Sequence, residues 1–173
     1  MTVLLAVEQV NAYFGDKQVL FGVDVAVAAG QKVAIVGESG SGKTVLAQGI
    51  MRLNPDVRLN GRMVYQEQDL LAMPEKQLAK IRGRDIGMVF QEPMTALNPV
   101  YTVGNQIAEV YTQHLGLTHK QPWKTDTDIL QETGIQDAAT KVKAYPFQLS
   151  GGQRQRAMIA MAVAASPKLL IAD

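Results

Sequence analysis

The sequence predicts an α/β fold in which a parallel sheet is interrupted by an inserted helical segment. A short apolar run at residues 32–36 leads into a glycine-rich loop and then into a segment with helical spacing, which is the order strand, loop, helix. A second apolar run, at residues 86–90, precedes a long region of helical pattern. A last apolar run, at residues 168–172, follows that region. This order indicates that the chain leaves the sheet, forms helices and returns to the sheet.

Strands dominate the front of the chain. Residues 3–10 and 19–28 are rich in Val, Leu and Ala and alternate loosely, which predicts two strands. The run at 32–36 is apolar and stops at Gly37, so we expect a buried strand there. Residues 62–65 predict one further strand.

Helical periodicity begins after the glycine-rich loop. Residues 44–53 have helical spacing and are stopped by Asn54 and Pro55, and a short helix is expected at 77–82. In the second half of the chain, helices are expected at 103–115, 126–133, 136–143 and about 152–165, the last of them capped by Ser150.

The composition excludes several classes of function. The 173 residues include 17 Lys and Arg and 16 Asp and Glu, a formal charge of only +1, so the strongly basic surface of a nucleic-acid-binding protein is absent. The chain has no cysteine, which excludes disulfides, thiolate metal sites and a cysteine nucleophile. Its apolar runs are far shorter than the ~20 residues of a membrane-spanning helix, and its N-terminus lacks the basic region of a signal peptide. We expect a chain that does not itself cross a membrane.

Residues 37–44 match the phosphate-loop pattern G-x-x-x-x-G-K-[ST] in full. Glycine lets the backbone approach phosphate oxygens, and the N–H groups of the loop and of the following helix bind anions. Lys43 would bring a positive charge to the β and γ phosphates, and Thr44 would offer a hydroxyl to Mg²⁺. A chance glycine-rich turn is the alternative, but the predicted strand and helix on either side are the context that the pattern requires. The predicted nucleotide-binding residues are Gly37, Ser39, Gly40, Ser41, Gly42, Lys43 and Thr44.

A second glycine motif precedes the last long helix, and it carries a resemblance to a known family. Taken alone, residues 149–153 (Leu-Ser-Gly-Gly-Gln) are a serine helix cap with flexible glycines. Together with the phosphate loop and a strand that ends at Asp173, they resemble the signature motif of ATP-binding-cassette (ABC) proteins. The resemblance covers essentially the whole chain. It implies a P-loop NTPase core with a parallel sheet, an N-terminal antiparallel β subdomain and an inserted α-helical subdomain, incomplete at the C-terminus.

The resemblance also implies how the chain is organised. It predicts a single truncated ABC ATPase domain over residues 1–173. Residues 1–91 would form the β subdomain and the P-loop core, residues 92–165 the helical subdomain with the signature motif, and residues 166–173 the return strand of the core.

Three residues outside the glycine motifs match functional positions of the family. Tyr13 lies where the family has an aromatic ring that stacks on adenine, although an ordinary strand aromatic is the alternative. Gln91 matches the Q-loop glutamine, which contacts Mg²⁺ and the attacking water and links the site to a membrane partner. Asp173 matches the Walker B aspartate, which orders Mg²⁺. The resemblance thus assigns catalytic roles to Lys43, Gln91 and Asp173, and metal binding to Thr44, Gln91 and Asp173.

The signature residues act, in the family, on the nucleotide of a second subunit. The resemblance implies that Ser150 and Gly152 contact the γ-phosphate held by the partner. The predicted nucleotide contacts in this motif are Ser150, Gly151, Gly152 and Gln153. ATP would therefore join two cassettes, in a homodimer or a heterodimer, and hydrolysis would separate them.

Longer stretches resemble the ATP-binding subunits of oligopeptide and dipeptide importers, a branch that includes nickel, glutathione and microcin-type peptide importers. The stretches are residues 37–43, 82–83, 90–99 and 145–162. Thr44 replaces the more usual Ser and keeps the hydroxyl, and Phe147 stands where the branch often has His. The resemblance implies an ATPase on the cytoplasmic side of the cell (inner) membrane. It would be bound to two transmembrane permease subunits, would be served indirectly by a periplasmic or extracellular solute-binding protein, and would not bind nucleic acid.

One expected group is missing from the sequence. In the family the Walker B aspartate is followed by a glutamate that polarises the attacking water, a contribution that is typically ~10²–10⁴-fold in rate. We therefore expect the chain to be truncated and to bind ATP better than it hydrolyses ATP. The alternatives are a nucleotide-binding fragment without hydrolysis of its own, a soluble ABC ATPase of DNA repair or translation, and a small-molecule kinase, which would not explain residues 149–153.

Overall fold

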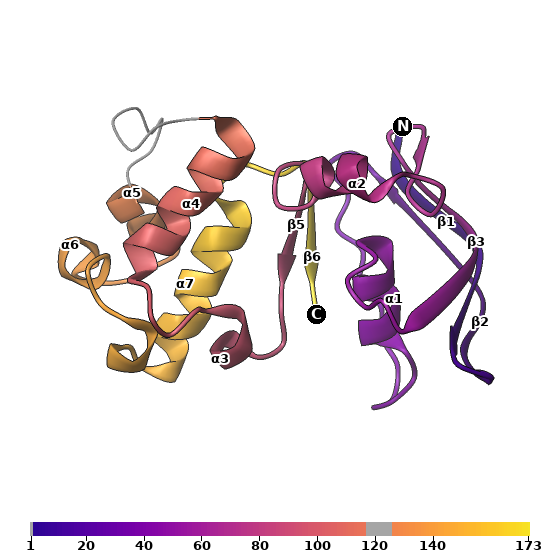
Figure 1. Cartoon of the computed structure of the whole chain (residues 1–173), viewed down its shortest axis with the longest axis horizontal. Helices are drawn as coiled ribbons and strands as arrows, with labels where there is room; N and C mark the ends of the chain where they lie inside the picture. The colour runs from indigo at the N-terminus through magenta and orange to yellow at the C-terminus, as the bar shows by residue number, and fades with distance from the viewer. Residues whose placement is uncertain (1, 117–125) are drawn as a thin grey trace. The chain divides into compact units, whose positions relative to one another are not determined.

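The computed structural model describes residues 2–116 and 126–173, and the chain divides into two compact units, Met1–Ala79 and Lys80–Asp173. Each unit combines strands with helices, as Figure 1 shows. The predicted α/β class is therefore confirmed.

A four-stranded antiparallel sheet dominates the first unit. Its strands occur in the order β2-β1-β3-β4, so the longest pairings flank β1. The predicted β-rich front is correct, and its strands are longer than predicted because hydrogen bonding continues beyond the apolar runs. The strands are β1 (Val3–Phe14), β2 (Lys17–Ala28), β3 (Val57–Tyr65) and β4 (Gln68–Asp69).

An irregularity in β1 sets which side chains are buried. Gln9 has a φ of 48°, and the register with both neighbouring strands shifts around it. The carboxylate of Asp24 accepts a hydrogen bond of 2.8 Å from the Gln9 backbone N–H, and another from the Gln9 side-chain amide. Strict alternation would place Val7 and Val10 on opposite faces, but both are buried. The bulge at Gln9 therefore keeps one apolar face along the whole strand.

Helix α1 (Lys43–Ile50) packs on this sheet (Figure 1). A Cβ added to Gly49 would lie 3.4 Å from the side chain of Leu59 on β3, so the helix comes close to the strand. Just after α1, the Arg52 guanidinium donates to the carbonyls of Leu70 and Met73 at 3.2 and 2.6 Å. These bonds fix the segment that leads to α2 (Glu75–Ile81).

The prediction of a buried strand at residues 32–36 is wrong for this structure. The segment has no ladder hydrogen bonds among the described residues, and Ile35 and Val36 are 49% and 92% exposed. A strand is stabilised by hydrogen-bonded neighbours, and no described strand of the first unit pairs with this segment. The prediction rested on apolar composition alone, and composition does not show whether a neighbouring strand is present to form the hydrogen bonds.

The second unit contains a pair of parallel strands joined through a helical segment. Strands β5 (Ile86–Val89) and β6 (Leu169–Ala172) pair in parallel, with Ile86 opposite Leu169. The predicted departure from the sheet into helices and return to it is thus confirmed. Between the strands lie α3 (Pro93–Ala96), α4 (Val103–Leu115), α5 (Asp126–Glu132), α6 (Ala138–Lys141), the 3₁₀ helix η1 (Pro146–Gln148) and α7 (Gly151–Val163).

Helix α4 has the bounds that its sequence pattern predicts, because both of its ends carry local signals. The Thr102 hydroxyl accepts a hydrogen bond from the Asn105 N–H at the start, and Gly116 closes the helix with a φ of 64°. Helix α6 is shorter than the predicted helix at 136–143. Strand β4 and the short helices α3 and η1 were not predicted.

The core of the second unit lies where α4 meets α7 and α5. Val103, Ile107 and Tyr111 follow one another at four-residue spacing on α4, and all three are buried. Helix α7 contributes small side chains, which let the two helices approach closely (Figure 1). These buried small residues are Ala157, Ala160 and, just beyond the helix, Ala164.

Apart from tyrosines, Gln106 is the only polar side chain buried among the described residues, at 5% exposure. Its Oε1 accepts a hydrogen bond from the Asn98 N–H at 2.9 Å. Its Nε2 donates to the carbonyls of Asn98 and Tyr101, both at 3.0 Å. Gln106 thereby satisfies three backbone groups of the loop that precedes α4.

We expect Gln106→Leu to lower the free energy of unfolding by about 1–3 kcal/mol, because the three backbone groups lose their partner inside the protein. Gln113→Leu is the matched control, since Gln113 lies on the same helix and is exposed. Urea unfolding followed by circular dichroism measures both. Equal midpoints for the two variants would show that the buried amide does not hold the loop.

Tyr111 carries a buried hydroxyl that lacks a hydrogen-bond partner within the described structure. Burial, and then the charges of Asp126, Asp128 and Glu132, raise the pKa of Tyr111 from 10.0 to about 12. The folded protein therefore holds this proton more tightly than the unfolded chain. The resulting stability is fully present below about pH 10 and is lost as the pH rises toward 12.

Replacing this phenol with phenyl tests that linkage. Between pH 8 and pH 11 the wild type should lose on the order of 1 kcal/mol of stability that Tyr111→Phe does not lose. At pH 8 the variant should be as stable as the wild type or slightly more stable, because the lost hydroxyl has no partner. Denaturant unfolding at both pH values measures this. Tyr101→Phe, at an exposed ring, is the control, and an equal loss in all three proteins would contradict the prediction.

Candidate functional site

The side chain of Lys43 lies inside the glycine-rich loop that precedes α1. Its ammonium donates to the carbonyls of Gly37 and Glu38, both at 2.8 Å, and to the Ser41 hydroxyl at 3.3 Å. The loop is closed by a further bond of 3.2 Å from the Ser41 N–H to the Glu38 carbonyl. The positive charge of Lys43 is thus held by two backbone carbonyls and one hydroxyl of the loop.

Two glycines give the loop its path. Gly40 and Gly42 have φ values of 81° and 93°, in the left-handed region that other residues rarely adopt. At Gly42 space is also limiting, since an added Cβ would lie 2.5 Å from Leu20 Cδ2 and 3.3 Å from the Val19 carbonyl oxygen. A side chain at position 42 would therefore be strained by this φ and would displace the end of Leu20.

The start of α1 is suited to an anion. Its N-cap residue is Gly42, which has no side chain to cap the helix, and its first turn contains no acidic residue. Backbone N–H groups at a helix start carry partial positive charge, and Lys43 adds a full charge beside them. The described loop therefore offers donors and positive charge but no competing carboxylate from the helix.

Tyr13 lies near the end of β1, in the same unit as the loop. It pairs with Gln18 on β2 and with Arg58 on β3, and the Arg58 guanidinium covers its ring at 4.9 Å from the centroid. Arg58 was not singled out from the sequence, because 45 positions separate it from Tyr13 and only the strand register joins them.

Gln91 and Asp173 occur at the same edge of the parallel pair β5–β6. Val89 ends β5 opposite Ala172, which ends β6, and the Asp173 N–H donates to the Val89 carbonyl at 3.0 Å. Gln91 follows two residues after β5. The carboxyl ends of the two strands thus bring together two of the residues that the sequence singles out, in the second unit.

Ser150 and Gln153 form a reciprocal cap at the start of α7. The Ser150 hydroxyl accepts from the Gln153 N–H at 3.3 Å, and the Gln153 side chain accepts from the Ser150 N–H at 3.0 Å. The helix-cap interpretation of this motif is therefore correct as a local description. It accounts for Ser150 and Gln153 but not for the two glycines between them.

The glycines at the start of α7 have no structural requirement among the described residues. Neither Gly151 nor Gly152 has a positive φ, and a Cβ added to either would meet nothing within 4 Å. Glycine in a helix costs up to about 1 kcal/mol relative to alanine. An open, side-chain-free helix start leaves room for a group that approaches from outside the chain.

The predicted site residues are divided between the two units. The phosphate loop and Tyr13 belong to the first unit, and Gln91, Asp173 and the signature motif belong to the second. Among the described residues, no group of three His, Cys, Asp or Glu side chains is arranged to hold a metal ion.

Two side chains with shifted pKa values, Tyr111 and His114, lie in the second unit and are not predicted site residues. Burial, and then the charge of Arg84, lower the pKa of His114. Its imidazole contacts the turn at Gly83, where an added Cβ would lie 2.5 Å from Nε2. The His114 ring therefore packs against this turn.

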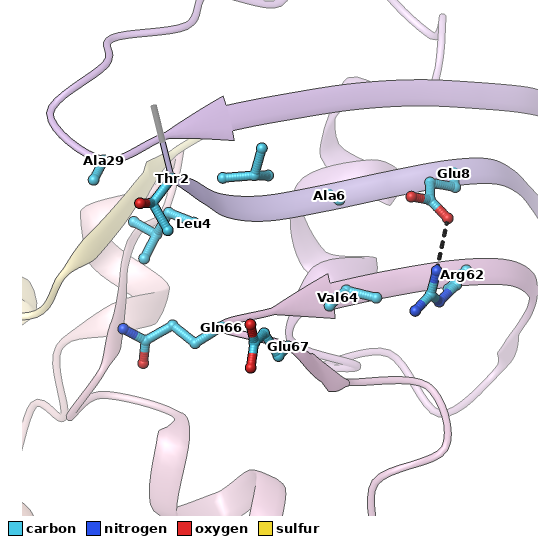
Figure 2. Close-up of a pocket in the computed structure, with 10 residues that line it drawn as sticks. Thr2, Leu4, Ala6, Glu8, Ala29, Arg62, Val64, Gln66 and Glu67 are labelled. Carbon is cyan, nitrogen blue, oxygen red and sulfur yellow. Dashed lines mark hydrogen bonds and ion pairs between the residues drawn. The ribbon is translucent and has the colours of Figure 1, made fainter.

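A cavity of about 570 Å³ lies on the antiparallel sheet of the first unit (Figure 2). Glu8 and Arg62 form an ion pair of 3.3 Å at one end of it. None of the predicted nucleotide-binding residues lines this cavity. Its lining residues are Thr2, Val3, Leu4, Ala6, Glu8, Ala29, Arg62, Val64, Gln66 and Glu67.

In the part of the chain that the structure describes, no helix is long and apolar enough to span a membrane.

Comparison with known proteins gives a consistent picture. The family model described as "ABC transporter" matches residues 20–173. The oligopeptide transport ATP-binding protein OppD of Bacillus subtilis is 43% identical over 166 residues, which cover 94% of this chain and 46% of that protein. The dipeptide transport ATP-binding protein DppD of Haemophilus influenzae is 44% identical over 176 residues, which cover 98% of this chain and 53% of that protein. The chain thus spans about half the length of these curated relatives.

A solved structure agrees in fold. It is the dimeric, post-hydrolysis state of the ATP-binding cassette MJ0796 bound to ADP and Pi, with a TM-score of 0.80 and 26% sequence identity. The match covers 98% of this chain and 73% of that one.

The cap at α7 can be tested apart from any ligand. We expect Ser150→Ala to lower the free energy of unfolding by about 1 kcal/mol, because the Gln153 N–H loses its acceptor. Ser150→Asp keeps an acceptor at the N-cap and should retain most of the stability. Denaturant unfolding followed by helical circular dichroism compares the variants, and an unchanged Ser150→Ala protein would show that the cap contributes nothing.

Proposed function

Because the chain belongs to the ABC transporter family, we propose that it forms the ATP-binding part of an importer for peptides or a related solute. The observation that carries the proposal is the ammonium of Lys43, held by a loop of backbone groups at the start of α1. The relatives named above, a transport ATP-binding protein for oligopeptides and one for dipeptides, support the substrate class.

In this proposal the loop at residues 37–44 binds the phosphates of ATP. Lys43 exchanges the carbonyls of Gly37 and Glu38 for phosphate oxygens, which are stronger acceptors because they are charged. The backbone N–H groups from Gly40 to the start of α1 complete the cradle. Tyr13, in the same unit, provides the ring on which adenine stacks.

We assign Thr44, Gln91 and Asp173 to the Mg²⁺ that accompanies ATP. The hydroxyl, amide and carboxylate oxygens of these residues are the ligand types that Mg²⁺ takes alongside phosphate and water. When bound, Mg²⁺ would neutralise charge on the β and γ phosphates. Gln91 would orient the attacking water, and Asp173 would help to hold the cation. Together with Lys43 they form the catalytic set of the proposed ATPase.

A second cassette would complete each nucleotide site. The helix start at Ser150 presents Gly151 and Gly152 with no side chain over them, which allows close approach of a phosphate held by the partner. Gln153 keeps that helix start in place through its bond to the Ser150 N–H. The dimeric cassette MJ0796 with ADP and Pi supports this arrangement.

The transport step requires membrane subunits. We propose that two permease subunits bind this ATPase on the cytoplasmic face of the membrane. ATP binding and hydrolysis would then open the solute pathway of the permease to one side of the membrane and the other in turn. A solute-binding protein outside would deliver the peptide. The names of the relatives, which describe transport ATP-binding proteins, support this placement.

The binding role of Lys43 gives the direct test. Lys43→Ala should weaken ATP binding about 10- to 100-fold, because charged hydrogen bonds to phosphate are lost. Isothermal titration with Mg²⁺ and ATP measures the affinity. Lys76→Ala is the matched control, since it removes the same charge from an exposed position of the same unit.

The outcome separates the proposal from its alternatives. Loss of binding in Lys43→Ala with unchanged binding in Lys76→Ala supports a phosphate site at the loop. Unchanged ATP affinity in both variants would place nucleotide elsewhere and would overturn the proposal.

A further inference from the structure

Leu20 on β2 is the side chain against which the glycine-rich loop turns into α1. It is 4% exposed, and its Cδ2 would lie 2.5 Å from a Cβ added to Gly42. Leu20 Cδ2 is therefore at most about 4 Å from the Cα of that glycine, which is contact distance. We propose that Leu20 is a positioning residue of the phosphate site, which holds the start of α1 in place on the sheet. This inference rests on the proposed binding of ATP by the loop.

Strand pairing builds a row of apolar side chains under α1. Ala12 on β1 lies opposite Leu20 on β2 and opposite Leu59 on β3. Because directly opposed residues project to the same face of a sheet, these three side chains cross it on one face. Leu59 contacts α1 further along, since a Cβ added to Gly49 would lie 3.4 Å from its side chain. Gly42 and Gly49 are about two helical turns apart, so the helix rests on the row at both glycines.

The position of Gly42 determines where the groups proposed to bind phosphate lie. The carbonyl of Gly42 accepts a hydrogen bond of 2.9 Å from the Leu46 N–H, so the first turn of α1 is built on this glycine. The next residue is Lys43, whose ammonium is bonded to the carbonyls of Gly37 and Glu38. A shift of Gly42 therefore moves the N–H groups of the first turn together with the stem of Lys43. Hydrogen bonds weaken steeply when donors are misaligned, so such a shift lowers the affinity for phosphate.

The space beside Gly42 is filled from the sheet, because glycine itself has no side chain to fill it. The φ of 93° at this position disfavours any residue that could supply one. Shortening Leu20 would leave a gap that the surrounding structure closes only in part. The loop and the helix start could then take several arrangements. Only the fraction of molecules with aligned donors would bind phosphate at full affinity.

Two substitutions at one position test the contact. Leu20→Val removes both δ carbons but keeps a residue suited to a strand, whereas Leu20→Met keeps an atom at the δ position. Leu20→Val should weaken the binding of ATP and of inorganic tripolyphosphate, each with Mg²⁺, by the same factor of about three- to tenfold. The factor is the same because the effect lies at the phosphate end. Leu20→Met should bind both ligands within about twofold of the wild type. Isothermal titration measures all of these affinities.

Leu5→Val is the matched control. Leu5 is 2% exposed and pairs with Val27 and Tyr65, roughly 20 Å along β1 from the row under α1. This variant loses the same atoms from a buried site of the same sheet, so its unfolding midpoint in urea should fall about as far as that of Leu20→Val. It should nevertheless bind both ligands as the wild type does. A similar loss of stability with unequal affinity separates positioning of the loop from general loosening of the sheet.

Four results would overturn the inference while the proposed ATP site stands. Leu20→Val could bind both ligands like the wild type, or Leu20→Met could bind them as weakly as Leu20→Val. Leu5→Val could weaken binding as much as Leu20→Val, which would mean general loosening. Leu20→Val could also lose affinity for ATP alone, which would mean that Leu20 acts at the base. A wild type that binds neither ligand, or a Lys43→Ala protein that binds both normally, would overturn the proposed function itself.

Discussion

The close approach of Gly42 to strand β2 is the constraint on which the candidate site depends. A carbon added at this position would displace the end of the Leu20 side chain, and the φ of 93° is one that other residues rarely adopt. Glycine here lets α1 begin against the sheet, and the N–H groups at a helix start carry partial positive charge. The same contact brings the loop near the end of β1 that carries Tyr13.

Features encoded locally could be predicted from the sequence. The glycine-rich loop around Lys43, the cap at Ser150 and the bounds of α4 depend on residues within a few positions of one another, and the structure has each of them as local structure. Residues 32–36 show the limit of this approach. Their apolar run predicts a strand, but a strand exists only with a hydrogen-bonded neighbour, and sequence pattern does not identify that neighbour. The stack of Arg58 on Tyr13 and the hydrogen bonds of Gln106 could not be predicted for the same reason, because both depend on tertiary structure.

The second unit combines a packed helical core with an open start of helix α7. Gln106 satisfies three backbone groups of the loop before α4, and the small residues of α7 allow that helix to pack tightly against α4. At the start of α7, a Cβ added to Gly151 or Gly152 would meet no described atom within 4 Å. A stable helix with an unobstructed first turn suits a role in binding an anion presented by another subunit, which is the role we propose for the signature motif.

The most direct test of the central claim is the backbone amide NMR spectrum of the chain, recorded during titration with Mg²⁺ and a non-hydrolysable ATP analogue. Binding at the loop predicts that the largest changes in chemical shift occur in residues 39–44, with smaller changes at Tyr13. The amide signals of the residues that line the cavity on the sheet in Figure 2 should keep their chemical shifts. If the largest changes in chemical shift occur at that cavity and the amide signals of the loop are unchanged, the phosphate site is not at Lys43 and the proposed function is contradicted.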